Sequence, residues 1–274
     1  MIRQDRGTIP FFFAPQLLPY TELLHAVSTR HGGMSTGCYE SLNLSFQVGD
    51  EQERVLQNYH LVSRQLHFDL ASLVTCQQVH HNALALIDES YLNQHCYLPG
   101  KMVPEADGLA TDVPGITLLT RYADCVPLLF YNQQRHAVAI AHAGWKGTLA
   151  QIGLQMSELL RREFKCRPEH TIVVVGPSIG PCCYQISSSM ADETVKHLPQ
   201  AESCILAPPG DEISLDLWQL NRIQLTASGI PAGNIFSAGI CTSCTVDHFF
   251  SYRREAKLTG RFGVLIGLRK ESSL

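Results

Sequence analysis

The sequence predicts an α/β protein in which helices flank a mixed β-sheet. Short apolar runs rich in Val, Ile and Leu occupy the centre of the 274-residue chain, and segments with helical periodicity lie before, between and after them. Two neighbouring apolar runs are separated only by a short polar turn, so strands occur in pairs as well as between helices. No repeat, low-complexity tract or linker divides the sequence. We therefore expect a single catalytic domain over residues 1–274.

Four apolar segments predict the central strands. Their short lengths and β-branched content favour strands over helices. The polar sequence NQQR between Tyr131 and His136 predicts a hairpin between the second and third of them. A further apolar strand follows Arg261 near the end of the chain. The four central segments are ITLLT at 116–120, VPLLFY at 126–131, AVAIAH at 137–142 and TIVVVGP at 171–177.

Four other segments predict helices. Residues 50–67 carry Asp and Glu in their first turn, which favours a helix start, and residues 216–229 end at a glycine before Pro231. Residues 147–164 show the same apolar period of three to four, and residues 187–198 predict a fourth helix. Helices therefore lie on both sides of the central strands along the chain.

Composition and charge exclude several classes of function. The formal net charge is −4 and the chain has no dense Lys/Arg block, which argues against nucleic-acid binding and against a polybasic membrane anchor. The apolar N-terminal stretch is interrupted by prolines and lacks the features of a secretory signal. We therefore expect a cytoplasmic protein that binds neither nucleic acid nor membrane, with its ten cysteines reduced. The sequence leaves the oligomeric state open.

Three residues with metal-binding side chains lie at the ends of apolar runs. Cys125 precedes VPLLF, His142 follows AVAIA and His80 closes the run LVTCQQVH. Two imidazoles and one thiolate make a three-ligand catalytic zinc set, which leaves one tetrahedral position for water or substrate. The same residue types also occur as inert core residues, because a cysteine beside an apolar strand packs as a small hydrophobe. The pattern alone leaves both interpretations open.

Other histidines and cysteines compete for the role of ligand. Cys241 and Cys244 form a C-x-x-C pair, and Cys182 and Cys183 are adjacent. These four thiols could supply a closed structural zinc site, but a zinc ribbon needs a second spaced pair, and adjacent cysteines seldom both reach one ion. We therefore expect them to fill core and turn positions. The competing imidazoles are His31, His81, His136 and His248.

Glycine-rich and arginine-rich segments offer an anion site. Residues 28–50, 142–147 and 176–181 combine glycine with polar side chains, as loops that line ligand sites often do. The second of these runs from a strand into a helix start, where free N–H groups attract anions. Near the C-terminus, three arginines surround a turn and could hold a phosphate or form a solvated hairpin edge. They are Arg253, Arg254 and Arg261.

Nine short motifs in family order resemble the YfiH-type family, also called laccase-domain or polyphenol oxidase proteins. Members of this family are described as zinc-dependent purine nucleoside phosphorylases. The resemblance covers residues 28–268 and implies the layered α/β sandwich of the YfiH and CNF-toxin type. The motifs are S-T-R-x-G-G-x-S-x-G, S-L-N-L, V-G-D, Q-V-H, E-A-D-G, A-D-C, H-A-G-W-K-G, G-P-S-I-G-P-C-C-Y and F-F-S-Y-R with T-G-R.

The resemblance implies a mononuclear zinc site and a surrounding pocket. Its ligands are the His of Q-V-H, the Cys of A-D-C and the His of H-A-G-W, which are His80, Cys125 and His142 here. Copper is the other metal that the older family names suggest. Carry-over onto the matching motifs makes six further residues members of the pocket: Arg30, Asn43, Asp107, Lys146, Cys183 and Arg253.

The implied activity is phosphorolysis of purine nucleosides. The substrates are phosphate with adenosine, inosine, guanosine or S-methyl-5'-thioadenosine, and the products are the free base and a ribose 1-phosphate. Adenosine deaminase activity accompanies it. Zinc deaminases use a glutamate close to a ligand as proton shuttle, and neither His80 nor His142 begins an H-x-E sequence. Asp124, next to Cys125, and Asp107 are the substitutes by position.

Three other interpretations use the same residues. Cys125 could act as a nucleophile with His142 as base and Asp107 or Asn43 as orienting group, in an amidase-like hydrolase for which cell-wall precursors are a candidate substrate. Copper-dependent polyphenol oxidation would need several histidine-rich copper centres, and the sequence has no H-x-H pair. A binding protein stabilised by zinc would have a closed four-ligand site and no turnover.

Overall fold

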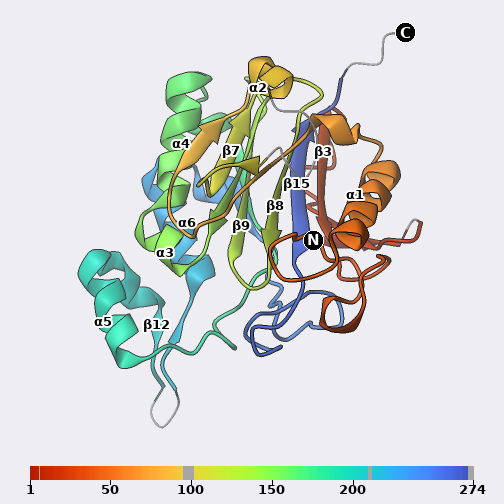
Figure 1. The fold of residues 1–274 in the computed structure, drawn as a ribbon. Coiled ribbons are helices and arrows are strands. Elements are labelled where there is room, and N and C mark those ends of the chain that lie inside the picture. The colour runs from red at the N-terminus through yellow and green to blue at the C-terminus, as the bar shows by residue number, and fades with distance from the viewer. Residues whose placement is uncertain (6, 95–101, 209–211, 271–274) are drawn as a thin grey trace.

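Two mixed β-sheets pack face to face in the computed structural model, and helices cover both outer faces (Figure 1). The structure describes residues 1–270 except 6, 95–101 and 209–211. The first sheet has seven strands in the order β1 (Ile2–Gln4), β2 (Phe11–Phe13), β3 (Leu23–Ser28), β15 (Phe262–Leu268), β8 (Thr117–Tyr122), β4 (Leu73–Cys76) and β6 (Met102–Val103).

The second sheet contains the predicted hairpin. Its strands β9 and β10 pair antiparallel, with Asn132 opposite Ala137 at the turn, which confirms the hairpin. A two-stranded sheet, β12 (Ile205–Leu206) and β13 (Ser214–Leu215), lies apart from it. The six strands of the second sheet follow the order β14 (Ile235–Ser237), β11 (Thr171–Val175), β9 (Val126–Asn132), β10 (Ala137–Ala143), β7 (Gly108–Thr111) and β5 (Leu84–Leu86).

The helices form the two outer layers. α1 packs on the first sheet, and α3, α4 and α6 pack on the second (Figure 1). The predicted helices 50–67, 187–198 and 216–229 are confirmed, but segment 147–164 contains two helices because Gln151 adopts a left-handed φ of 58°. The helices are α1 (Gln52–Leu66), α2 (Glu89–Gln94), α3 (Trp145–Leu149), α4 (Ile152–Glu163), α5 (Ser188–His197) and α6 (Leu217–Ala227).

Strand β10 shows how the alternation in its sequence builds the layers. Its alanines at 137, 139, 141 and 143 face the helices, where their small side chains let Met156 of α4 approach the sheet. Val138 and Ile140 point to the opposite face and pack between the two sheets. His142 has the same parity as Val138 and Ile140. Its imidazole therefore lies on the face of the second sheet that meets the first.

The chain crosses from the first sheet to the second at three places. The crossings lead from β4 to β5, from β6 to β7 and from β8 to β9. The sequence predicted a mixed sheet and the helices that flank it, and both are present. Periodicity did not reveal that strands 117–122 and 126–132, which are neighbours along the chain, belong to different sheets. Each crossing leaves a short irregular segment at the same end of the sandwich.

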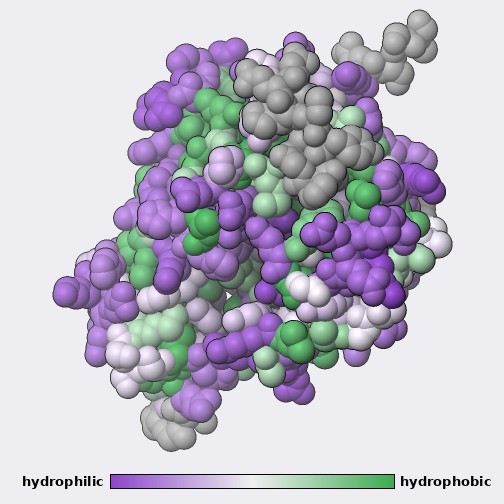
Figure 2. Space-filling model, viewed as in Figure 1, coloured by the Kyte–Doolittle hydropathy of each residue, from purple (hydrophilic) through white to green (hydrophobic). Residues whose placement is uncertain are grey.

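Hydrophilic side chains cover most of the face shown in Figure 2, and hydrophobic side chains form scattered patches there. Among the helices of the described residues, none is both long enough and apolar enough to cross a membrane.

Candidate metal centre and its cavity

The three predicted metal ligands lie together where the sheets are connected. His80 is on the β4–β5 crossing, Cys125 ends the β8–β9 crossing and His142 is in β10. Their candidate ligand atoms all lie within 4.8 Å of one another. The rings of His80 and His142 are 4.8 Å apart between centroids and nearly perpendicular, at 81°. The strand-end pattern therefore pointed to residues that do form one cluster.

Asp107, on the β6–β7 crossing, fixes two of these ligands. Its buried carboxylate accepts hydrogen bonds from the backbone N–H groups of His80 at 3.0 Å and His81 at 2.7 Å. Its Oδ1 atom also lies 2.8 Å from Nδ1 of His142. This contact holds the Nδ1 side of the ring and leaves Nε2 for the cluster. His80 takes a positive φ of 61°, which the hydrogen bonds of its loop to Asp107 support.

The residues of the cluster shift one another's pKa values in the direction that favours a thiolate on Cys125. Burial raises the pKa of Cys125, but the neighbouring His142 and His80 outweigh it and lower that pKa to about 6. Burial lowers the pKa of His142, while Cys125 and Asp107 outweigh it and raise that pKa to about 9. Without a metal, both shifts favour a thiolate on Cys125 and an imidazolium on His142. A thiolate is also the form in which cysteine binds metal.

The donor set and the space around it fit a single metal ion. Two imidazoles and one thiolate are ligands that zinc prefers, and three protein ligands leave a coordination position open. A Cβ atom at Gly144 would lie 2.9 Å from Sγ of Cys125 and 3.6 Å from Cδ2 of His80. Glycine at this position therefore leaves room for the cluster. His142 also has the carboxylate partner typical of metal-binding histidines, in Asp107.

Asp124 supports the neighbouring loops. Its φ is 93°, and its Oδ1 atom accepts a hydrogen bond from Oγ1 of Thr242 at 2.7 Å. Its Oδ2 atom accepts the backbone N–H of Arg253 at 2.6 Å, and its carbonyl oxygen accepts that of Ile179 at 2.8 Å. Through its side chain and its carbonyl oxygen, Asp124 therefore joins its own loop to residues that are distant from it in sequence.

The cluster opens into a cavity of about 810 Å³. This volume is within the range of pockets that hold small molecules, roughly 300–1,000 Å³. Aromatic and apolar side chains form part of its wall, including Trp145, Tyr184, Tyr252, Ile179 and Leu217. The cavity therefore combines the candidate metal centre with surfaces suited to a planar, partly apolar ligand.

The cavity wall is strongly cationic. Five cationic side chains line it, and Asp124 is the one carboxylate among its described lining residues, although the whole chain has a net charge of −4. Within the described part of the chain, none of the five lies within 4 Å of a carboxylate oxygen. Positive charge is therefore concentrated at this cavity. The five are Arg121, Lys146, Arg253, Lys257 and Arg261.

Two of the residues that the resemblance placed in the pocket do not line the cavity and lie next to residues that form or adjoin its wall. Arg30 pairs with Glu255 at 2.9 Å and lies over the ring of Phe250, and it does not line the cavity. Asn43 is fully buried, and its Oδ1 atom accepts the backbone N–H groups of Ser45 and Arg261, both of which line the cavity. Lys146 and Arg253 line it directly.

The sequence patterns did not single out several of the residues that line the cavity. Arg121 is buried at the end of β8 and donates to the carbonyl oxygen of Cys76 at 2.5 Å. Tyr184 follows the adjacent cysteines, and the centroid of its ring lies 5.3 Å from the guanidinium carbon of Arg253. The arginine-rich turn was a usable signal, because it identified Arg261 together with Arg253. Lys257 belongs to the same turn.

The competing histidines lie elsewhere. His31 and His248 contact each other, with ring centroids 6.2 Å apart, and Nδ1 of His136 lies 3.6 Å from Glu22. His81 contacts the neighbouring Asn82. In the described residues, none of these histidines belongs to a cluster of three or more potential metal ligands.

The four cysteines expected to fill core and turns do lie at turns, and they also meet at one point, which the sequence did not predict. The Sγ atoms of Cys182, Cys183, Cys241 and Cys244 all lie within 4.8 Å of one another. Cys182 and Cys244 are exposed, so they are not core residues. Adjacent cysteines do reach one point here because the chain turns sharply between Gly180 and Tyr184. Cys183, expected in the pocket, belongs to this cluster and is not among the residues that line the cavity.

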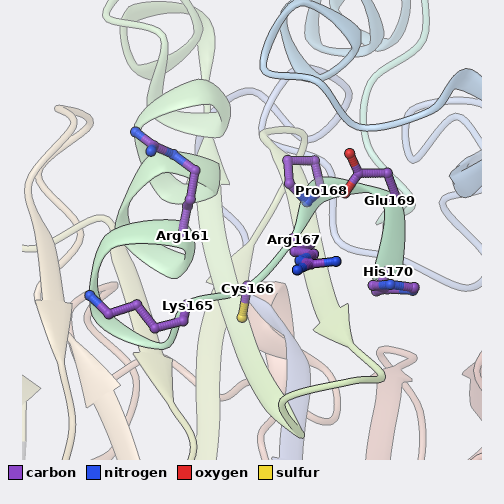
Figure 3. A pocket seen from close by; sticks show the side chains of 7 residues that line it. All are labelled: Arg161, Lys165, Cys166, Arg167, Pro168, Glu169 and His170. Carbon is purple, nitrogen blue, oxygen red and sulfur yellow. The ribbon is translucent and has the colours of Figure 1, made fainter.

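A separate hollow of about 570 Å³ lies beside the C-terminal end of α4 (Figure 3). The side chains of Arg161 and of residues 165–170 line it, and several are charged. None of its lining residues belongs to either cluster of potential metal ligands in the described structure. The cavity at His80, Cys125 and His142 is therefore the candidate functional site.

Comparison with known proteins shows the family to which the chain belongs. Residues 24–269 match the family described as multi-copper polyphenol oxidoreductase laccase. A relative from Geobacillus stearothermophilus, named purine nucleoside phosphorylase YlmD, is 36% identical over 255 residues, covering 92% of this chain and 93% of the relative. A protein from an unknown prokaryotic organism, named adenosine deaminase RL5, is 32% identical and covers 88% of this chain and 92% of its own length.

Solved structures share the fold over nearly the full length. The crystal structure of YlmD from Geobacillus stearothermophilus superimposes with a TM-score of 0.89 at 34% identity, covering 98% of this chain and 99% of that one. The Bacillus licheniformis YfiH structure gives a TM-score of 0.88 at 32% identity, covering 97% of this chain and 99% of that one. This chain therefore belongs to the laccase-like multi-copper polyphenol oxidoreductase family, the family of YlmD and YfiH.

Proposed function

We propose that this protein, acting as one catalytic domain over residues 1–274, cleaves purine nucleosides with phosphate to give the free base and ribose 1-phosphate. The observation that carries the proposal is the juxtaposition of the His–Cys–His cluster with a cationic, partly aromatic cavity wall. The names of the relatives, purine nucleoside phosphorylase and adenosine deaminase, support the same reaction class. The substrates we propose are adenosine, inosine, guanosine and S-methyl-5'-thioadenosine.

The cationic residues of the wall hold phosphate. Lys146 and Lys257 line the cavity as exposed residues, and Arg261 lines it half-buried. A charged hydrogen bond to phosphate is worth about 1.5–3 kcal/mol, so a few of them position the anion for attack. Asn43 and Asp124 act as positioning residues, because their hydrogen bonds hold the backbone of Arg261 and Arg253.

The aromatic and apolar residues hold the purine. Tyr184, Trp145 and Leu217 offer flat or apolar surfaces of the size of a base. In the reaction, a phosphate oxygen forms a bond to C1' while the bond from C1' to the purine breaks. The electron pair leaves with the base, which then takes up a proton. Positive charge that develops on the ribose lies next to the bound phosphate, which stabilises it.

His80, Cys125 and His142 would hold zinc. When bound, zinc supplies a Lewis acid beside the substrate and lowers the pKa of water, which serves deamination of adenosine as well as departure of the base. Asp107 keeps Nδ1 of His142 engaged and supports the His80 loop. Because Asp107 and Asp124 are both occupied by several hydrogen bonds, we assign them to positioning.

The test incubates the purified protein with each of the four nucleosides, with and without phosphate, and separates products by chromatography. We expect base and ribose 1-phosphate only when phosphate is present, and inosine from adenosine under both conditions. Metal analysis of the same sample should give zinc, and the zinc content should fall in His80→Ala. Copper instead of zinc, with oxidation of phenols and no base release, would support the oxidase interpretation.

A second candidate function uses Cys125 as a nucleophile. The contact of His142 with Asp107 at 2.8 Å and the low pKa of Cys125, about 6, are also the features of a Cys–His–Asp hydrolase. Such a hydrolase needs one imidazole, but His80 also approaches the sulfur, and a second imidazole suits metal binding better. Full hydrolytic turnover in a metal-free His80→Ala variant would favour the nucleophile over the zinc proposal.

A further inference from the structure

Four cysteine thiols meet between two loops that lie next to the cavity. Cys182 and Cys183 are in the turn that follows Gly180, and Cys241 and Cys244 are in the turn that follows β14. Sγ of Cys244 lies 3.4 Å from Sγ of Cys183 and 3.6 Å from Sγ of Cys182. All four sulfurs lie within 4.8 Å of one another, although the two pairs are about sixty residues apart in sequence.

These separations fit sulfurs arranged around one ion. A tetrahedral zinc site with zinc–sulfur bonds of about 2.3 Å places its sulfurs about 3.8 Å apart. A disulfide bond requires about 2.05 Å. The contacts of 3.4 and 3.6 Å are close to the former value and far from the latter. Four thiols in mutual contact also gain little by remaining protonated and unligated, because S–H groups are weak hydrogen-bond donors.

One backbone group stabilises a thiolate at Cys241. The backbone N–H of Gly180 donates to Sγ of Cys241 at 3.3 Å, which is a hydrogen bond that stabilises negative charge on sulfur. Cys182 and Cys244 are exposed, so an ion can enter from solvent. Four sulfur ligands complete a tetrahedral shell and leave no position for substrate, in contrast to the three ligands of the His–Cys–His cluster.

We propose that this cluster binds one structural zinc ion through four thiolates, those of Cys182, Cys183, Cys241 and Cys244. The ion cross-links the loop at 177–186 to the loop at 239–245. These loops already meet through a parallel bridge between Ser178 and Cys241. Such a site stabilises the folded chain, because its ligands come together only in the folded state.

The cross-linked loops carry part of the cavity wall. Ile179 and Tyr184 precede and follow the turn of the first cysteine pair, and both line the cavity. The guanidinium of Arg253 donates to the carbonyl oxygens of Cys183 at 3.0 Å and Gln185 at 3.1 Å. The zinc ion therefore fixes the segment on which Arg253 and Tyr184 are positioned. Its role is separate from the reaction itself, and the site does not depend on the proposed activity.

The first test counts zinc by elemental analysis in protein purified with reductant and zinc present. We expect two zinc ions per chain in the wild type and one in Cys244→Ser, whose exposed side chain can change without opening a core cavity. Cys38→Ser, which removes another exposed cysteine outside the cluster, is the matched control and should retain two. Equal zinc content in the two variants would overturn the proposal.

The second test examines the cluster alone and remains informative if Cys244→Ser fails to fold. His80→Ala removes a ligand of the other site, so X-ray absorption at the zinc edge should then report a shell of sulfur only, at about 2.3 Å. A shell that contains nitrogen, or no zinc at all, would contradict the site. A disulfide between cluster cysteines, found by mass spectrometry in the reductant-treated protein, would replace zinc binding by a redox role and also overturn the proposal.

Discussion

Asp107 and His142 form a buried pair in which Oδ1 of the carboxylate lies 2.8 Å from Nδ1 of the imidazole. The backbone N–H of His142 also donates to the carbonyl oxygen of Asp107 at 2.7 Å. The two residues are thus joined through side chain and main chain. Because the same carboxylate holds the backbone of His80, one acidic residue orients both imidazoles of the cluster.

Replacing Asp107 by Asn should weaken metal binding without removing a ligand. The amide keeps one acceptor oxygen but turns an N–H₂ group towards donors that now have no partner, and it removes the negative charge beside His142. We expect zinc affinity to fall about 10–100-fold, measured by competition with a chromophoric chelator. Asp112→Asn, an exposed carboxylate on the next loop, is the control and should bind zinc like the wild type.

The reactivity of Cys125 should depend on pH and on zinc. Iodoacetamide attacks the thiolate, and the pKa of Cys125 is lowered to about 6 in the absence of metal. Alkylation of the metal-free protein should therefore begin near pH 6, below the range of an ordinary thiol, and fall as the pH drops through that value. Peptide mapping by mass spectrometry measures it.

Two controls define that result. His142→Ala removes the imidazole that favours the thiolate, so alkylation of Cys125 should then require a higher pH. Saturating zinc should slow the reaction strongly at neutral pH, because the bound cation withdraws electron density from the sulfur and makes it a poorer nucleophile. Undiminished alkylation at full zinc occupancy would show that Cys125 is not a ligand.

Adding a methyl group at Gly144 should disturb the metal centre by contact alone. The new Cβ atom would lie 2.9 Å from Sγ of Cys125, closer than such atoms approach without a shift of one of them. The backbone at Gly144 has a φ of −66°, so alanine adds no backbone strain there. We expect about a tenfold loss of zinc affinity in Gly144→Ala. Gly233→Ala, where no atom lies within 4 Å, should leave it unchanged.

Removing the charge of Lys146 should impair phosphate use. Its ammonium group lines the cavity, and the loss of one charged hydrogen bond of about 1.5–3 kcal/mol corresponds to roughly a 10- to 100-fold loss. We expect this loss in kcat/KM for phosphate in Lys146→Ala, with partial recovery in Lys146→Arg. Lys165→Ala, which removes a lysine from the separate hollow beside α4, should match the wild type. An unchanged kcat/KM for phosphate in Lys146→Ala would exclude Lys146 from the phosphate site.

Local sequence patterns determined the elements of this protein. The apolar runs at 126–131 and 137–142 predict strands because alternate side chains along them are buried, and NQQR joins them as a hairpin. The helices that cover the sheets are likewise predicted by local sequence, because apolar residues recur every three to four positions along them. The motifs of the family resemblance singled out His80, Cys125 and His142, and the structure brings these three together.

Only the tertiary structure decided what surrounds them. Periodicity reports that a strand has a buried face, but not which sheet the strand joins, so the three crossings that carry His80, Asp107 and Cys125 to one place could not be derived. Arg30 shows the same limit, because its pairing with Glu255 is a contact between segments more than two hundred residues apart. The four-cysteine cluster depends on two turns that meet only in the folded chain, and adjacency in sequence argued against it.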